Sequence, residues 1–391
     1  MKKRILFSAS LFHLLNDAAA VTVPMIFPLF YSQQFIIKKY SHIGILSTLG
    51  FLVTFLFQII IANISDRFEY RTMLFFSFMG ISLSLALITF SSGFASLLFI
   101  YLTMRVFNSF YHSVGVAWVS KTHPSQAIDF AMGTQSGSGN LGVFVAFVSS
   151  GFLAQNFGWK VPLFVWAGVC FFLGLISFLS VRNISTKSKE RRMLDFASWM
   201  ETLRIIRIYI PGFVFGGACW GATVYYVPSL LNHKFHIPLG QTGLFLALWI
   251  GIGTVMTYMF GFLVQRFNRL RVSLVALAGA SLFLFLLGTS LKVEIAVGSL
   301  FFFGVFLFLV YPAFQSFVGN AVPEKNQTQA FSLVANVQML TGSIVVLISG
   351  FISDMFGINS PFIFLGIGGI FILLYYMFKQ PLVTRNDSLV K

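Results

Sequence analysis

Charged residues are scarce in this chain. Asp, Glu, Lys and Arg make up only 9% of its 391 residues, whereas 57% are hydrophobic and the mean hydropathy is +0.86. A soluble domain needs charged residues to cover its exterior, whereas a lipid-facing exterior is apolar. The composition therefore excludes a soluble globular protein and predicts a chain that folds in a lipid bilayer.

Cysteines and enzyme motifs are also scarce. Cys170 and Cys219 both fall in apolar stretches, which excludes a disulfide framework and a cysteine-based metal site. The sequence contains neither the G-x-x-x-x-G-K-[ST] motif for ATP nor the H-E-x-x-H motif for zinc. We therefore expect no enzymatic activity, no cofactor and no bound metal. Without an ATP motif, the energy for any process that this chain carries out must come from an ion or solute gradient.

Apolar stretches of about 20 residues, each long enough to form a transmembrane helix, recur from end to end. The sequence predicts twelve, at 5–31, 42–64, 72–91, 95–118, 130–156, 159–181, 208–232, 240–265, 271–291, 294–318, 328–353 and 360–379. The first contains Asn16 and Asp17 and lacks a small-residue cleavage site, so we interpret it as a retained helix. The prediction is an all-α membrane protein.

The net charge of +15 is explained by where the basic residues lie. If the N-terminus is cytoplasmic, most of the 26 Lys and Arg lie on the cytoplasmic side; the lysines expected outside are Lys38, Lys39, Lys160, Lys234 and Lys292. This asymmetry is the positive-inside pattern, and it makes both termini cytoplasmic. The basic charge therefore indicates topology, and we expect no nucleic-acid partner.

The chain divides into two similar halves. A shift of 199 residues aligns them without gaps, and "SGFLAQNFG" at 150–158 returns as "SGFISDMFG" at 349–357. With six helices per half, the repeats are parallel and related by an axis along the membrane normal. We expect a six-helix bundle at 1–181, a cytoplasmic linker with a basic amphipathic helix on the membrane surface at 182–207, a second bundle at 208–379 and a cytoplasmic tail at 380–391.

The stretch "ANISDRFEYRTM" at 62–73 resembles the G-x-x-x-D-R-x-G-R-R signature of the major facilitator superfamily, although Ala62 and Glu69 replace its two glycines and Thr72 replaces its last basic residue. "GFLVQRFNRLR" at 261–271 is a degenerate copy. The resemblance implies two six-helix bundles around one central cavity, alternating access and a monomer. We also expect the charge cluster of Asp66, Arg67, Arg71 and Arg266 to form a conformational latch at the inner face; a purely topological role for the arginines is the alternative.

The segment "GSGNLG" at 137–142 fits the G-x-G-x-x-G fingerprint of dinucleotide-binding loops. It lies within an apolar helical stretch, with no strand before it, so a nucleotide loop is excluded. Small residues at three- and four-residue spacing instead allow membrane helices to approach closely. We expect helix packing here, with a substrate contact by Asn140 as the alternative.

Two ionisable residues lie deep in predicted spans, and such residues are functional candidates because charge in the bilayer interior is costly. Asp17 shares a helix face with His13 and Asn16, and Arg105 shares one with Asn108, Ser109 and His112. We predict an Asp17–Arg105 pair with a role in proton coupling or substrate binding; a static ion pair is the alternative. His13 and His112 either exchange protons or serve as interhelical hydrogen bonders.

Other polar and aromatic residues of the spans are candidates to line a substrate cavity. They are Asn16, Asn108, Gln135, Asn140, Trp220, Tyr225, Tyr226, Tyr311, Gln315, Asn336 and Gln338.

Within the superfamily, "FHLLNDAAAVTVPMIFPLF" at 12–30 is similar to the first helix of the fosmidomycin-resistance group, with its H-x-x-x-D pattern followed by prolines. That resemblance implies a proton-coupled exporter of small, often anionic compounds or drugs in the bacterial inner membrane, with the lipid bilayer, protons and a small-molecule substrate as its partners. A proton-coupled uptake permease for an organic or inorganic anion is one alternative. A non-transporting membrane sensor is another, from a different functional class.

Overall fold

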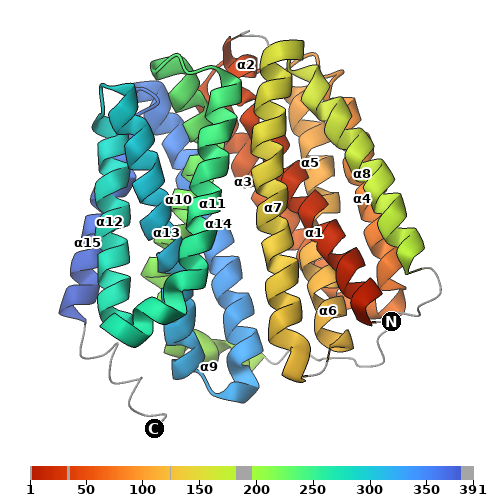
Figure 1. Cartoon of the computed structure of the whole chain (residues 1–391), viewed down its shortest axis with the longest axis vertical. Coiled ribbons are helices and arrows are strands. Elements are labelled where there is room, and N and C mark those ends of the chain that lie inside the picture. The colour runs from red at the N-terminus through yellow and green to blue at the C-terminus, as the bar shows by residue number, and fades with distance from the viewer. Residues whose placement is uncertain (1, 33–35, 124, 182–195, 380–391) are drawn as a thin grey trace. The chain divides into compact units, whose positions relative to one another are not determined.

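The structure is a computed structural model that describes residues 2–32, 36–123, 125–181 and 196–379. Every regular element in these ranges is helical (Figure 1). The described residues contain 11 helices long and apolar enough to cross a membrane, or up to 12 if one bent pair forms a single span. This confirms the all-α membrane fold expected from the sequence.

The first half contains these elements: α1 (Lys2–Met25), α2 (Phe27–Ser32), α3 (Tyr40–Ile64), the 3₁₀ turn η1 (Ser65–Arg67), α4 (Tyr70–Ile88), α5 (Phe94–Phe110), the π-helix η2 (Tyr111–Gly115), α6 (Val116–Thr122), α7 (Ser125–Phe157) and α8 (Lys160–Ser180). Together α1 and α2 form one span. Pro28 lacks an amide hydrogen, so the carbonyl of Pro24 loses its helical partner and the helix breaks between them.

The second half contains α9 (Phe196–Ile206), α10 (Ile210–Ser229), the π-helix η3 (Leu230–Lys234), α11 (Leu239–Phe267), α12 (Arg269–Thr289), α13 (Val293–Ala321), α14 (Glu324–Phe356) and α15 (Ser360–Phe378). The expected amphipathic helix corresponds to α9, which is bent by 84° from the span that follows it. It packs against α13 and α14 through its buried side, which includes Thr202 and Ile206. Its placement on the membrane surface stays a prediction.

The contacts within the chain divide it into two compact units. One consists of Met1–Arg192 with Leu231–Ala247, and the other of Met193–Leu230 with Leu248–Lys391. The sequence did not predict that Leu231–Ala247 would group with the first half. The expected bundle boundaries remain a prediction, and the tail at 380–391 lies outside the described residues.

Within the first unit, α1 packs along α7, and α4 packs on α5 and α8 (Figure 1). The GSGNLG segment lies inside α7, at its contact with α1. A β-carbon added at Gly142 would collide with the backbone carbonyl of Leu14. The segment is therefore a close helix–helix contact, as the glycine spacing predicted.

Candidate functional site

Helix α1 supplies one carboxylate and its nearest partners. His13 and Asp17 are one helical turn apart, and His13 Nε2 lies 3.1 Å from Asp17 Oδ2. The second carboxylate oxygen, Oδ1, accepts a hydrogen bond of 3.1 Å from Asn16 Nδ2. The Asp17 side chain is only 22% exposed, so this carboxylate meets mostly protein groups.

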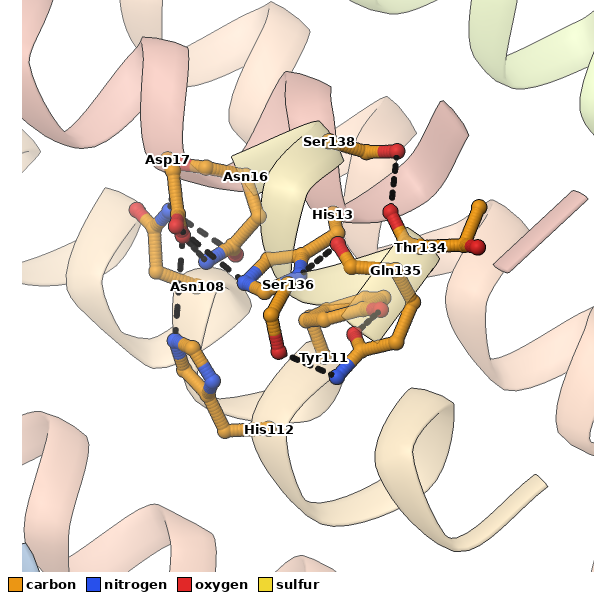
Figure 2. Close-up of polar contacts among 10 residues, drawn as sticks. All are labelled: His13, Asn16, Asp17, Asn108, Tyr111, His112, Thr134, Gln135, Ser136 and Ser138. Atoms are coloured by element: carbon orange, nitrogen blue, oxygen red, sulfur yellow. Dashed lines mark hydrogen bonds and ion pairs between the residues drawn. The ribbon is translucent and has the colours of Figure 1, made fainter. Parts of the chain in front are cut away.

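The π-helix η2, which directly follows α5, brings the imidazole ring of His112 to the same carboxylate. His112 Nε2 lies 3.8 Å from Asp17 Oδ1 (Figure 2). π-helical insertions commonly occur at functional sites, where they redirect side chains that a regular α-helix would place elsewhere. Gly115 closes this insertion, and its lack of a side chain leaves room for the Tyr111 ring, which lies against it.

Tyr111 is a residue of the site that the sequence analysis missed. Its ring stacks on His13 with centroids 4.5 Å apart, and its hydroxyl donates a 2.7 Å hydrogen bond to Gln135 Oε1. It is completely buried. The only signal in the sequence was its position next to His112. That signal was not sufficient, because a regular helix would turn these two neighbours to different faces.

The backbone of helix α7 lies against His13 and Asp17. The Gln135 carbonyl lies 2.7 Å from His13 Nδ1, and the Gln135 side-chain amide donates to Ser136 Oγ at 3.2 Å. A β-carbon at Gly139 would lie 2.6 Å from Asp17 Oδ2 and 2.8 Å from His13 Nε2. Gly139 therefore allows the backbone of α7 to approach the His13–Asp17 contact, and no other residue type fits without displacing it.

These contacts require that one proton resides between His13 and Asp17. A carbonyl oxygen only accepts hydrogen bonds, so Nδ1 of His13 must carry a hydrogen and donate it to Gln135. The remaining nitrogen, Nε2, faces a carboxylate oxygen at 3.1 Å. Two lone pairs at that distance repel each other, so either the imidazole or the carboxyl group holds a further proton that links them.

The predicted Asp17–Arg105 pair is not formed, because Asp17 pairs with the two histidines. Arg105 Nε instead donates to the carbonyl of Gly50 on α3 at 3.4 Å, and the guanidinium lies 5.0 Å from the centre of the Phe51 ring. Gly50 makes this approach possible, since a β-carbon there would lie 3.2 Å from Arg105 Cγ. Among the described residues, no carboxylate forms a salt bridge with Arg105, which is only 6% exposed.

Asn108 links α5 to α1 next to this site. Its Nδ2 donates to the Asn16 backbone carbonyl at 3.2 Å and to Asn16 Oδ1 at 3.1 Å. Its own Oδ1 is buried and has no hydrogen-bond partner among the described residues. A buried acceptor without a partner costs free energy of folding.

The structure thus brings together seven of the residues named from the sequence or found beside them: His13, Asn16, Asp17, Asn108, Tyr111, His112 and Gln135. Asn140 lies on α7 next to Gly139 and is half-buried.

The remaining cavity candidates lie in the second unit, in aromatic and backbone contacts. Trp220 packs with the rings of Trp249 and Phe308 at centroid distances of 5.2 and 5.9 Å. Tyr226 is buried and donates to the backbone of Val346 at 2.8 Å. Tyr225 is buried, whereas Tyr311, Gln315, Asn336 and Gln338 are half-buried. Their contact with substrate stays a prediction.

The latch residues are only partly described. Arg71 donates to the carbonyl of Val181 at 3.1 Å and lies 5.7 Å from the centre of the Phe178 ring. Arg67 is exposed, and Arg266 lies over the neighbouring Phe267 ring. The side chain of Asp66 lies outside the described residues, so the latch stays a prediction.

Comparison with protein families decides the class of this fold. The Major Facilitator Superfamily profile matches residues 6–346. The chain belongs to the major facilitator superfamily. Membership in this transporter family agrees with the expectation of a multi-pass membrane protein without enzymatic activity.

Relatives within the superfamily include the Multidrug resistance protein MdtG of Salmonella paratyphi A and of Salmonella arizonae. Each is 24% identical to this chain over 200 residues, which are 50% of this chain and 49% of the relative. The chain spans about half the length of the curated relatives it matches.

Solved structures of major facilitator proteins share the fold over nearly the whole chain. A bacterial homolog to the human lysosomal transporter Spinster, inward-facing and occupied, has a TM-score of 0.84 at 14% identity and covers 97% of this chain and 96% of that one. The D-xylose-proton symporter has a TM-score of 0.78 at 14% identity, with coverage of 96% and 97%. At these identities the likeness extends to the fold alone.

Proposed function

We propose that this chain is a proton-coupled exporter of small anionic compounds or drugs in the bacterial inner membrane, with both termini cytoplasmic. The observation that carries the proposal is the proton required between His13 and Asp17. The helix 1 resemblance to the fosmidomycin-resistance group and the 24% identity to a multidrug resistance protein support the export of drug-like compounds.

The site has the parts that a proton relay needs. Asp17 Oδ2 faces His13, which is 10% exposed, while Oδ1 faces His112, which is 47% exposed. The proton therefore has a buried position and a neighbouring, more accessible base through which it leaves or enters. Proton exchange through His112 couples the site to solution.

Arg105 supplies the positive charge that an anionic substrate would bind. A guanidinium in the protein interior is costly unless it is paired, and the described residues offer it a backbone carbonyl and an aromatic face but no carboxylate. Charge-assisted hydrogen bonds from this group to a carboxylate or phosphonate would compensate that cost.

The test is proton movement in energised inverted membrane vesicles on addition of a panel of small anions and lipophilic drugs. We expect the wild type to release protons from the lumen with a transported compound, and Asp17→Asn to lose this release. Glu294→Gln, which removes an exposed carboxylate at the start of α13, is the matched control and should behave as the wild type.

Release of protons by Asp17→Asn at the wild-type rate would contradict the coupling role of this carboxylate. Proton movement into the lumen together with the compound would instead favour the uptake permease.

A further inference from the structure

We propose that His13, Asp17 and His112 form a binding site for a divalent transition-metal ion of the zinc class. Each residue offers one ligand atom, and the three atoms all lie within 4.8 Å of one another (Figure 2). Two imidazoles and a carboxylate are a donor set of catalytic and exchangeable zinc sites. This differs from the sequence expectation of no metal, which rested on the two isolated cysteines and on the absence of an H-E-x-x-H motif.

The distances already approach those of a coordination sphere. With metal–ligand bonds of 2.0–2.2 Å, two ligands of a tetrahedral ion lie about 3.3 Å apart. His13 Nε2 lies 3.1 Å from Asp17 Oδ2, and His112 Nε2 lies 3.8 Å from Asp17 Oδ1. His112 Nε2 must therefore move toward both Asp17 and His13 Nε2, by about 1.5 Å at most, because the three ligand atoms already lie within 4.8 Å of one another. His112 is nearly half exposed, so its ring has the freedom to make that movement.

The groups around the three ligands hold them as metal ligands are usually held. A metal-bound histidine donates its other ring hydrogen to a carbonyl or carboxylate, which fixes the tautomer and aims the free nitrogen at the ion. His13 Nδ1 donates in this way to the Gln135 carbonyl at 2.7 Å. Asn16 likewise donates to one oxygen of Asp17. These two bonds leave His13 Nε2 and Asp17 Oδ2 facing each other, which is where an ion would bind.

The site is also open to exchange. Three protein ligands leave one tetrahedral position for water or another small ligand. Gly139 contributes backbone without a side chain at the His13–Asp17 contact, and the exposed part of His112 gives an ion a route of entry. The ion replaces the proton between His13 and Asp17, because both occupy the same space.

Binding is measured on the full-length, detergent-solubilised chain after removal of any polyhistidine tag. Co²⁺ is the probe, because its visible absorption becomes intense in a tetrahedral site, and Zn²⁺ is added to displace it. We expect one saturable Co²⁺ site. Loss of a ligand in His112→Gln or Asp17→Asn should weaken it more than about 100-fold, since even outer-sphere partners contribute 10–100-fold.

His233→Gln is the matched control. His233 is another half-buried histidine, and its hydrogen-bond partners among the described residues are Tyr40, Ser32 and the Pro28 carbonyl. Its removal should leave the Co²⁺ affinity unchanged. His112 is the most exposed ligand, so His112→Gln is the variant least expected to disturb folding, and thermal unfolding of each variant checks this.

An absent tetrahedral Co²⁺ spectrum would overturn the inference, and so would equal Co²⁺ affinity in the wild type and His112→Gln. Co²⁺ binding by the solubilised chain does not depend on the proposed transport function. A chain that binds Co²⁺ but moves no protons therefore supports the metal site and contradicts only the proposed function. The reverse result contradicts only the metal site.

Discussion

Replacement of Gly139 by alanine should push His13 and Asp17 apart and break the hydrogen bond between them. The added carbon would lie 2.6 Å from Asp17 Oδ2 and 2.8 Å from His13 Nε2, whereas ordinary contacts begin at 3.4 Å. If both atoms retreat to that limit along their present directions, their separation grows from 3.1 Å to about 3.9 Å, beyond hydrogen-bond range. A hydrogen bond to a charged group contributes about 1.5–3 kcal/mol.

Loss of that free energy corresponds to a factor of about 10–100. We therefore expect Gly139→Ala to lower the initial rate of substrate-dependent proton release in inverted vesicles by this factor. Gly133→Ala is the matched control, since it lies on the same helix and a β-carbon there meets no atom within 4 Å.

Both variants should be present in the membrane in equal amounts and unfold at similar temperatures after solubilisation. Wild-type proton release by Gly139→Ala, under conditions in which Asp17→Asn is inactive, would refute the reasoning. In that case the carboxylate acts without its close partner on α1.

Three further substitutions test other parts of the site. Gly142→Ala should lower stability by about 1–3 kcal/mol, because its β-carbon meets the backbone carbonyl of Leu14, which cannot rotate away; thermal unfolding measures this, and an unchanged midpoint would contradict it. Tyr111→Phe removes the hydroxyl that donates to Gln135 and should cost about 1 kcal/mol of stability, whereas a wild-type unfolding midpoint would argue against this bond. Arg105→Lys should raise the half-saturating concentration of anionic substrates about tenfold, because lysine lacks the planar fork of guanidinium; an equal effect on uncharged substrates would exclude a direct anion contact.

The spans and the residues within one helix were accessible to prediction from the sequence. Hydropathy identifies the spans because the bilayer requires about 20 apolar residues for each. The one-turn spacing of His13 and Asp17 predicts their contact, because residues four apart share a helix face. The packing role of GSGNLG followed from its small residues in the same way.

The partners between helices could not be predicted in this manner. Helical spacing places Arg105 on a face but does not determine which neighbour that face meets, so the pair expected with Asp17 was wrong. The π-helix was also invisible, because its sequence has no distinct hydropathy pattern. Its extra residue per turn is what allows both Tyr111 and His112 to reach α1.

The π-helix also has a consequence for how this chain aligns with other members of the superfamily. A π turn accommodates one residue more than the α turn it replaces, so the span from Phe94 to Thr122 carries a residue that a regular helix of the same length would lack. In an alignment of superfamily members, those without partners for a helix 1 carboxylate should show a one-residue gap at Tyr111–Gly115, which makes the gap itself a marker for this kind of site.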